Sequence, residues 1–394
     1  MSSRSAELRS LVSGWTRRDE EAAVLQLLRE TPPGELDALL AEVELTDLIR
    51  GLDDRRMFGP DHRSALLDLL CRERRAELTL ERLADLVHAL HHGRTPASHE
   101  RAVRDVFLSL QGAELATLKN LVNAHGDYHD LDHLIFEDID DDDVREEILE
   151  HIARQAAGQQ SPDLKILSDI DDTVISMLHD RRFPRGVVYP GVVEFLCALD
   201  HGAAAEPGRP GDLTFLTARP SDAAGVVDSY TRNGLSGHGL PPHSVMTGSI
   251  LNLLTKGRIA QRKLVNFDRY RLLFPECAVV FLGDSGQADV RVGQAMLERD
   301  PDHVRAVFIH DVAGTDPRDR ERLAGTGVYL FDTYAGAAAH ALRLDLISSA
   351  AARQVRDAVR AGVAAADLQT TQRATVERHV AQDEALLAAA GVPA

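Results

Sequence analysis

Five short apolar runs after residue 160 constrain the fold more than any other feature of the sequence. Each run is long enough for one buried strand, and they occupy residues 164–167, 213–216, 278–282, 304–309 and 328–331. The stretches between the runs are long enough for crossover helices, so we expect a parallel sheet covered by helices. This part of the chain is therefore predicted to be an α/β domain with a Rossmann-like parallel sheet.

The chain before residue 160 has a different pattern. Its apolar residues recur at helical spacing, as at Leu36, Leu39 and Leu40 and again at Leu115 and Leu118. Runs of β-branched residues typical of strands are missing there, which predicts an all-helical domain. The last part of the chain is rich in alanine and also has a helical period. We therefore expect three parts, namely a helical domain at 1–160, an α/β domain at 161–345 and a helical segment at 346–394.

Two stretches of the helical domain resemble each other. The first contains Gly34-Glu35-Leu36, Leu48 and Arg63, and the second contains Ala113-Glu114-Leu115, Leu134 and Arg145. The match indicates either duplication of a helical unit or chance similarity between two amphipathic helix pairs. Both interpretations stay open at this point.

Charge and composition limit the partners of the chain. Its 394 residues carry a formal charge of −18, which repels nucleic-acid backbones and anionic headgroups unless a local basic patch exists. No apolar stretch is long enough to span a bilayer, and the start lacks the apolar core of a signal peptide. The three cysteines lie far apart, which favours neither a disulfide framework nor a thiolate zinc site. We expect a cytoplasmic protein that does not bind nucleic acid.

Carboxylates follow two of the predicted strands directly. Asp169 and Asp171 come after the first run, and Asp284 and Asp289 come after the third. Because ligands bind at the carboxyl ends of parallel strands, we expect these side chains to meet at one edge of the sheet. Thr217 ends the second run at the same edge, and Lys263 lies on a predicted helix before the third.

These residues resemble the motifs of the haloacid dehalogenase phosphatase superfamily, and more narrowly the catalytic domain of the actin-patch-associated phosphatidate phosphatases. The resemblance covers about residues 163 to 335. It rests on Asp169-Ile-Asp-Asp-Thr, Thr217-Ala-Arg-Pro, Lys263, Gly283-Asp-Ser-Gly-Gln-Ala-Asp and Val307-Phe-Ile-His-Asp-Val. It implies the haloacid dehalogenase type of sheet and hydrolysis of a phosphate monoester with Mg²⁺.

The resemblance also implies a role for each motif residue. Asp169 is expected to attack phosphorus and form an aspartyl-phosphate, while Asp171 protonates the leaving alkoxide and then activates water. Thr217 and Lys263 are expected to bind and balance the phosphoryl oxygens. The metal is expected to be held by Asp169, the carbonyl of Asp171, Asp284 and Asp289.

Several assignments near these motifs have alternatives. Lys256 is a rival of Lys263 for the phosphate-balancing lysine, and Thr173 either caps the turn after the strand or takes part in the site. A basic cluster follows the first motif, where the superfamily has its flap, and it predicts binding of an anionic substrate through Arg181, Arg182 and Arg185. Ordinary exposed charge is the alternative for these arginines. The segment 221–261 is too short for a large cap domain, which predicts an open site.

Two polar clusters of the helical domain remain. His125, His129 and His133 have the spacing of one helix face, which suits either a transition metal or simply a helix start. The acidic run Glu137–Asp143 follows no predicted strand, so we interpret it as solvated surface.

The sequence thus predicts a Mg²⁺-dependent phosphatase for an organic phosphate ester, with phosphatidate at a membrane surface as the first candidate substrate. The enzymatic alternative is a phosphatase for a nucleotide, a nucleic-acid end or a sugar phosphate. The alternative without catalysis is an interaction protein that binds a protein partner through its helical domain. The intact set of Asp169, Asp171, Thr217, Lys263 and Asp284 argues against the last alternative.

Overall fold

The computed structural model describes residues 3–12, 17–52, 61–92, 95–124, 130–161, 163–204, 211–220, 239–248, 256–286 and 288–393. The chain forms two compact units, Met1–Ala157 and Gly158–Ala394. The break lies close to the boundary expected after residue 160. The two units are described separately below.

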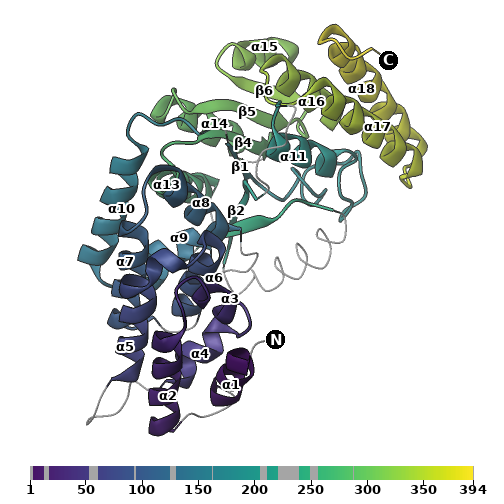
Figure 1. Ribbon diagram of the computed structural model, residues 1–394. Helices are drawn as coiled ribbons and strands as arrows, with labels where there is room; N and C mark the ends of the chain where they lie inside the picture. The colour runs from purple at the N-terminus through teal and green to yellow at the C-terminus, as the bar shows by residue number, and fades with distance from the viewer. Residues whose placement is uncertain are drawn as a thin grey trace. The chain divides into compact units, whose positions relative to one another are not determined.

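The described residues of the first unit are helical, without any strand (Figure 1). Side-chain caps explain where several helices begin, since Asp61, Thr79 and Asp130 accept the backbone N–H groups of Ser64, Arg82 and His133. The helices are α1 Ser3–Val12, α2 Arg18–Glu30, α3 Leu36–Leu40, α4 Leu45–Gly51, α5 His62–Asp68, the π-helix η1 Leu69–Glu73, the 3₁₀ helix η2 Arg75–Glu77, α6 Leu80–His91, α7 Ala97–Leu108, α8 Gly112–Asn123, α9 Leu131–His133, the π-helix η3 Leu134–Asp138 and α10 Asp142–Ala156.

The two similar stretches of this unit share a structural detail. Arg63, at the start of α5, donates from Nε to the carbonyl of Leu52 at 2.7 Å, and Leu52 caps the end of α4. Arg145, near the start of α10, donates from Nη1 to the carbonyl of Ile139 at 2.7 Å, and Ile139 caps the end of η3. In both stretches an arginine near the start of a helix thus binds the carbonyl at the end of the preceding helix, and duplication and chance similarity both stay open.

The acidic run of the first unit lies on its surface. Asp140 to Asp143 are exposed. Asp141 is the N-cap of α10, and its carboxylate accepts the N–H groups of Asp143 and Val144. The run is a solvated helix start, as predicted.

The second unit contains a six-stranded sheet in which every pair of neighbours is parallel. Its order is β3-β2-β1-β4-β5-β6. The strands are β1 Leu164–Ser168, β2 Leu213–Pro220, β3 His243–Gly248, β4 Ala278–Asp284, β5 Val304–His310 and β6 Val328–Phe331. All five apolar runs are strands, which confirms the predicted parallel sheet.

One strand, β3, was missed by the sequence prediction. Its residues His-Ser-Val-Met-Thr-Gly contain only two large apolar side chains, so neither an apolar run nor a clear alternation marks it. The strand pairs only with β2, at one edge of the sheet. An edge strand can carry more polar residues because it has a neighbour on one side only.

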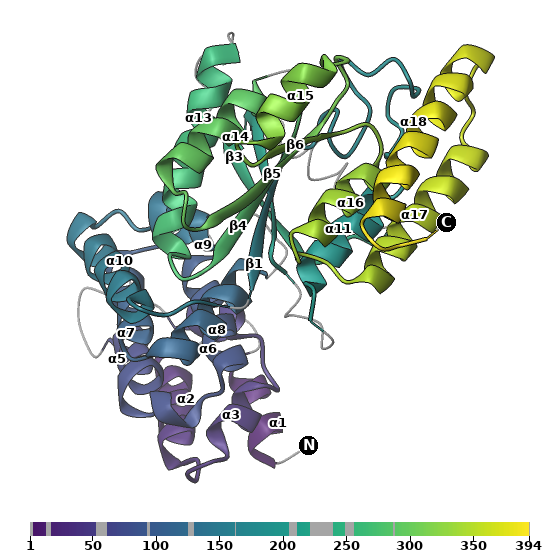
Figure 2. The same cartoon turned by 90° about the horizontal axis from the view of Figure 1, so that it is seen from above.

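Helices cover both faces of the sheet (Figure 2). α13, α14 and α15 lie on one face, and α11 and α16 lie on the other, with α17 and α18 packed outside them. The helices are α11 Val192–His201, α13 Lys256–Leu273, α14 Asp289–Arg299, α15 Pro317–Ala324, α16 Tyr334–Arg343, α17 Ser349–Ala365 and α18 Thr370–Ala389. Val359 of α17 and Leu387 of α18 belong to the same hydrophobic core as Ile166 of β1. The C-terminal helices are therefore part of this unit.

The strand order places the candidate site. From β1 the chain continues to β2 and β3 on one side, and it returns to place β4, β5 and β6 on the other side. The carboxyl ends of β1 and β4 thus lie at the point where the direction of the strand order reverses, which is where open parallel sheets bind ligands. Ser168 is paired with Leu282. Asp169 comes one residue and Asp284 two residues after this pair, so both lie at the same edge of the sheet.

Candidate active site

Four charged side chains meet at the ends of β1 and β4. Asp169 follows β1, and its N–H donates to the carbonyl of Leu282 at 2.9 Å. Lys263 of α13 reaches the same point, with Nζ 3.0 Å from Asp169 Oδ1 and 2.7 Å from Asp289 Oδ1. Asp169, Asp284 and Asp289 each offer a carboxylate oxygen within 4.8 Å of the others. The structure thus brings Asp169, Lys263, Asp284 and Asp289 together at one edge of the sheet, as the sequence predicts.

The loop after β4 is shaped by two glycines. A side chain at Gly283 would place its Cβ 2.6 Å from the Asp289 side chain, so only glycine allows Asp289 to come this close. Asp289 Oδ2 then accepts the N–H of Asp284 at 3.4 Å, and Asp284 Oδ1 accepts the N–H of Gly286 at 2.7 Å. These bonds hold the carboxylate of Asp284 at the end of β4 and that of Asp289 at the start of α14.

Two carboxylates of this cluster, those of Asp169 and Asp284, have raised pKa values. Burial raises the pKa of Asp169 to about 7, the charge of Asp289 adds to the rise, and Lys263 opposes it. Burial together with the charges of Asp289 and Asp169 raises the pKa of Asp284 to about 8. Burial alone would lower the pKa of Lys263, but its ion pairs with Asp169 and Asp289 raise it, so the lysine stays charged.

The donor set fits a divalent cation. Three buried carboxylates face one lysine, so the ionised cluster has more negative than positive charge in a largely buried place. Within the described part of the chain, Asp169 Oδ2 is buried and accepts no hydrogen bond. Oxygen ligands of this kind suit Mg²⁺. The residues that could hold it are Asp169, Asp284 and Asp289.

The residues after Asp169 form a tight turn. Asp171 makes an isolated bridge to Ile175, and its charge contributes to the raised pKa of Asp169. Asp172 has a left-handed backbone, with φ of 57°, and is fully buried. Thr173 is also buried, and its carbonyl accepts the hydroxyl of Tyr334 at 2.6 Å. The bridge to Ile175 and the bond between Thr173 and Tyr334 thus fix the turn that carries Asp171.

Asp172 organises the segment that follows, residues 177–185, which we call the flap. Its Oδ1 accepts the N–H groups of Met177 at 2.8 Å and Leu178 at 2.9 Å. Its Oδ2 accepts the N–H of His179 at 2.6 Å and lies 3.0 Å from the Nδ1 of the same residue. The start of the flap is therefore tied to the turn that carries the candidate nucleophile.

Two predicted residues have side chains outside the described part of the chain. Thr217 lies in β2, in the predicted strand end, and Lys256 is the first residue of α13. Lys263, seven residues further along the same helix, is the lysine that contacts Asp169.

The three predicted substrate-binding arginines differ in their environments. Arg181 and Arg185 are exposed, as a substrate-binding role would require. Arg182 instead turns inward, where its guanidinium pairs with Asp180 and lies 2.8 Å from His310 Nε2. Burial would lower the pKa of Arg182, but the hydrogen bonds and charge of Asp180 raise it. Substrate binding by Arg181, Arg182 and Arg185 stays a prediction, and Arg182 is the one of the three whose side chain is held in an internal network.

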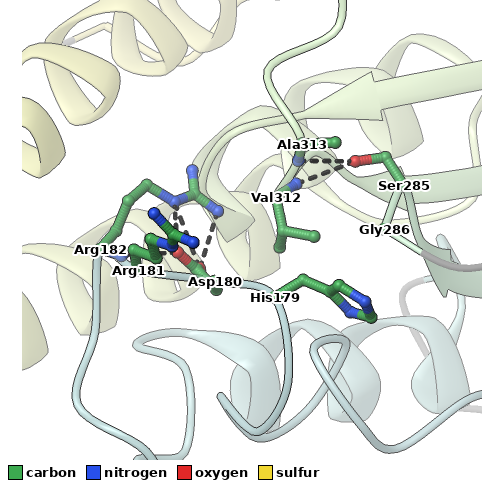
Figure 3. A pocket seen from close by; sticks show the side chains of 8 residues that line it. All are labelled: His179, Asp180, Arg181, Arg182, Ser285, Gly286, Val312 and Ala313. Atoms are coloured by element: carbon green, nitrogen blue, oxygen red, sulfur yellow. Dashed lines mark hydrogen bonds and ion pairs between the residues drawn. The ribbon is translucent and has the colours of Figure 1, made fainter.

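A cavity of about 440 Å³ lies between the flap and the loops after β4 and β5 (Figure 3). His179, Arg181 and Arg182 line one side of it, and Ser285, Gly286, Val312 and Ala313 line the other. Ser285 Oγ accepts the N–H groups of Val312 and Ala313, both at 3.0 Å, which joins the two loops. Ser285 and Gly286 directly follow Asp284, so the cavity lies next to the carboxyl end of β4.

His179 was not anticipated from the sequence. Its ring lies against Gly286, where an added Cβ would come within 2.7 Å of the ring carbon Cγ. With Nδ1 beside Asp172, the ring presents its remaining edge to the cavity. The sequence contains a histidine next to a basic cluster, but only the folded flap shows that it lies over the glycine after Asp284.

The histidine cluster of the first unit lies mostly outside the described residues, since His125 and His129 are among those not described. His133 Nε2 is 3.4 Å from Asp138 Oδ1. Metal binding there stays an untested prediction.

Comparisons with known proteins cover part of the second unit. Among the described residues, no helix combines the length and the apolar composition needed to cross a bilayer. Searches of curated proteins and of solved structures each found no match. Residues 164–311 match the family model for the catalytic domain of phosphatidate phosphatase APP1, which confirms the resemblance predicted from the motifs and the haloacid dehalogenase type of α/β fold.

Proposed function

We propose that the second unit is a Mg²⁺-dependent phosphatase whose nucleophile is Asp169. The observation that supports this most is the meeting of Asp169, Lys263, Asp284 and Asp289 at the ends of β1 and β4. A carboxylate that attacks a phosphate dianion needs positive charge around both groups. Mg²⁺ would supply that charge and polarise the phosphoryl group.

The proposed reaction has two steps. In the first, an oxygen of Asp169 forms a bond to phosphorus, the ester P–O bond breaks, and Asp171 gives its proton to the leaving alkoxide. In the second, Asp171 takes a proton from water, the water oxygen attacks phosphorus, and Asp169 is released with inorganic phosphate. Lys263 balances the charge of the phosphoryl oxygens, Asp289 holds Lys263 in place, and Thr217 binds the phosphoryl group.

We propose phosphatidate as the substrate. The matched family model is described as a phosphatidate phosphatase domain. The exposed part of the flap also suits an anionic lipid surface, since Arg181 and Arg185 are exposed and Leu178 is 56% exposed. The one acidic side chain among them, Asp180, is 1% exposed and paired with Arg182. The flap thus presents positive charge and an apolar side chain on a chain of strongly negative net charge.

We place this reaction in the cytoplasm. Cys71, Cys197 and Cys277 all lie in the described part of the chain and form no disulfide, which suits a reducing compartment.

Phosphate release from phosphatidate vesicles and from a soluble aryl phosphate tests the proposal. We expect both activities to require Mg²⁺ and to disappear with a chelator. The double variant Arg181→Ser/Arg185→Ser should act on vesicles with roughly 30-fold lower apparent affinity at low salt, since each basic residue near an anionic surface contributes ~1 kcal/mol. Its turnover of the aryl phosphate should change little.

The matched control is Arg318→Ser/Arg322→Ser, which removes two exposed arginines of α15 that are not part of the flap. It should leave both activities near wild type. Equal loss of vesicle and soluble activity in the flap variant would indicate that the arginines clamp a soluble phosphate ester. Full activity in excess chelator would contradict the Mg²⁺-dependent mechanism.

A further inference from the structure

Helix α18 reaches the flap, although it lies beyond the residues that match the family model. Gln372 Nε2 donates to the carbonyl of Arg181 at 2.8 Å. His379 Nδ1 lies 3.3 Å from Arg182 Nη1, and because a guanidinium can only donate, the imidazole nitrogen is the acceptor. Gln372 and His379 are seven residues apart, so they lie on the same face of the helix.

The same face anchors α18 to the rest of its unit. Val376 and Leu387 are buried in the core beneath the sheet helices. Asp383 Oδ2 accepts both the N–H of Thr333 at 2.7 Å and its hydroxyl at 2.8 Å, at the start of α16. The residues that reach the flap are therefore carried by a helix that is itself fixed.

A chain of hydrogen bonds continues from the flap to the candidate nucleophile's turn. Arg182 Nη2 donates to His310 Nε2 at 2.8 Å, and His310 Nδ1 donates to the carbonyl of Asp172 at 2.8 Å. Burial, with the charge of Arg182, lowers the pKa of His310 to about 4, so this histidine is neutral and can accept at one nitrogen and donate at the other. Arg182 thus connects α18 to the residue that holds the start of the flap.

We propose that α18 positions the flap over the cavity, with Gln372 and His379 as its positioning residues. This inference rests on the proposed function, because the flap matters for catalysis only if the cavity beside Asp284 takes the substrate. Without these two contacts, the flap keeps its bonds to Asp172, and Arg182 keeps its contacts with Asp180, His310 and the carbonyl of Asp332, but the link between the flap and α18 is lost. A loosened flap then places His179 and Arg181 less well around a substrate.

Hydrogen exchange of the full chain, together with kinetics on a soluble aryl phosphate, tests the inference. The variant Gln372→Ala/His379→Leu removes two hydrogen bonds, and we expect the amides of residues 177–185 to exchange at least about tenfold faster, since one hydrogen bond to a charged donor alone contributes ~1.5 kcal/mol. The amides of β1 and β4 should exchange as in wild type. We also expect a rise in KM larger than the fall in kcat, because the nucleophile itself is not moved.

Two further variants separate positioning from general stability. His379→Asn, in a chain that retains Gln372, keeps an acceptor near the position of Nδ1. The amides of its flap should therefore exchange as slowly as in wild type. Glu384→Ala removes the ion pair between α18 and Arg360 of α17, far from the flap, and should leave flap exchange unchanged even if it lowers the melting temperature. If the double variant does not fold, Gln372→Ala alone carries the same test.

Unchanged exchange of residues 177–185 in the folded variant would overturn the inference and reduce α18 to a cover for the core. The exchange measurement needs no activity, so it separates the two proposals. Faster flap exchange in a chain without phosphatase activity would support the positioning role of α18 while contradicting the proposed function.

Discussion

Replacing Lys263 with methionine removes the one lysine that contacts two of the three clustered carboxylates. Lys263 is 2% exposed and lies within 3.0 Å of Asp169 and Asp289. Methionine fills similar volume, so the main loss is the charge. Removing one partner of a buried ion pair typically costs ~3–5 kcal/mol, because the remaining charge stays buried without compensation. We expect the free energy of unfolding to fall by about this amount at alkaline pH in the presence of a chelator.

Two conditions should reduce that loss. The carboxyls of Asp169 and Asp284 have raised pKa values, so as the pH falls below neutrality they take up protons and the cost of burying them without the lysine falls. Mg²⁺ should also restore stability in part, because a bound cation replaces the missing positive charge. Urea unfolding at several pH values, with Mg²⁺ or with chelator, measures both effects.

The control for this prediction is Lys256→Met, at the first position of the same helix. This change should alter stability by only about 0.5 kcal/mol, because Lys263 and not Lys256 makes the ion pairs with Asp169 and Asp289. Phosphatase activity should be lost in Lys263→Met and kept in Lys256→Met. A small and pH-independent loss in Lys263→Met, equal to that of the control, would refute the role given to this ion pair.

Two other predictions follow from the same cluster. Mg²⁺ affinity should weaken as the pH falls through about 8 and then about 7, because Asp284 and Asp169 must release protons before they bind the ion. Calorimetry in buffers of different ionisation enthalpy should detect that release. A Mg²⁺ affinity that does not depend on pH would contradict the raised pKa values. Gly283→Ala should cost ~1–3 kcal/mol of stability and most of the activity, because its Cβ would displace the Asp289 side chain. The control is Gly257→Ala, at an open position of α13, which should lower neither the thermal unfolding temperature nor the turnover.

The strands that carry the site were predictable because their chemistry is local. β1 and β4 are apolar runs that end directly in Asp169 and Asp284, so the sequence shows both the strand and the residue at its end. Lys263 could be placed on a helix but not distinguished from Lys256, since the choice depends on which turn of α13 faces the sheet edge. The strand β3 was missed because its side chains are mostly polar.

The flap was harder to predict because its order comes from distant residues. Arg182 contacts His310 and His379, which are 128 and 197 residues away in the sequence. The sequence positions of Arg181, Arg182 and Arg185 do not show which of the three side chains turns inward. The contacts of α18 with the flap likewise have no local signal, since Gln372 and His379 are ordinary polar residues of a long helix.

The most direct test of the central claim is to identify the phosphorylated residue. Asp171→Asn should still form the intermediate from an aryl phosphate, whose leaving group needs no acid, but should break it down slowly because water lacks its base. After reaction with Mg²⁺ and an acid quench, mass spectrometry should find the phosphoryl group on the peptide that contains Asp169, at Asp169 itself, and none in Asp169→Asn/Asp171→Asn. A phosphoryl group on Ser168 or Thr173, or undiminished turnover by Asp169→Asn, would contradict the account.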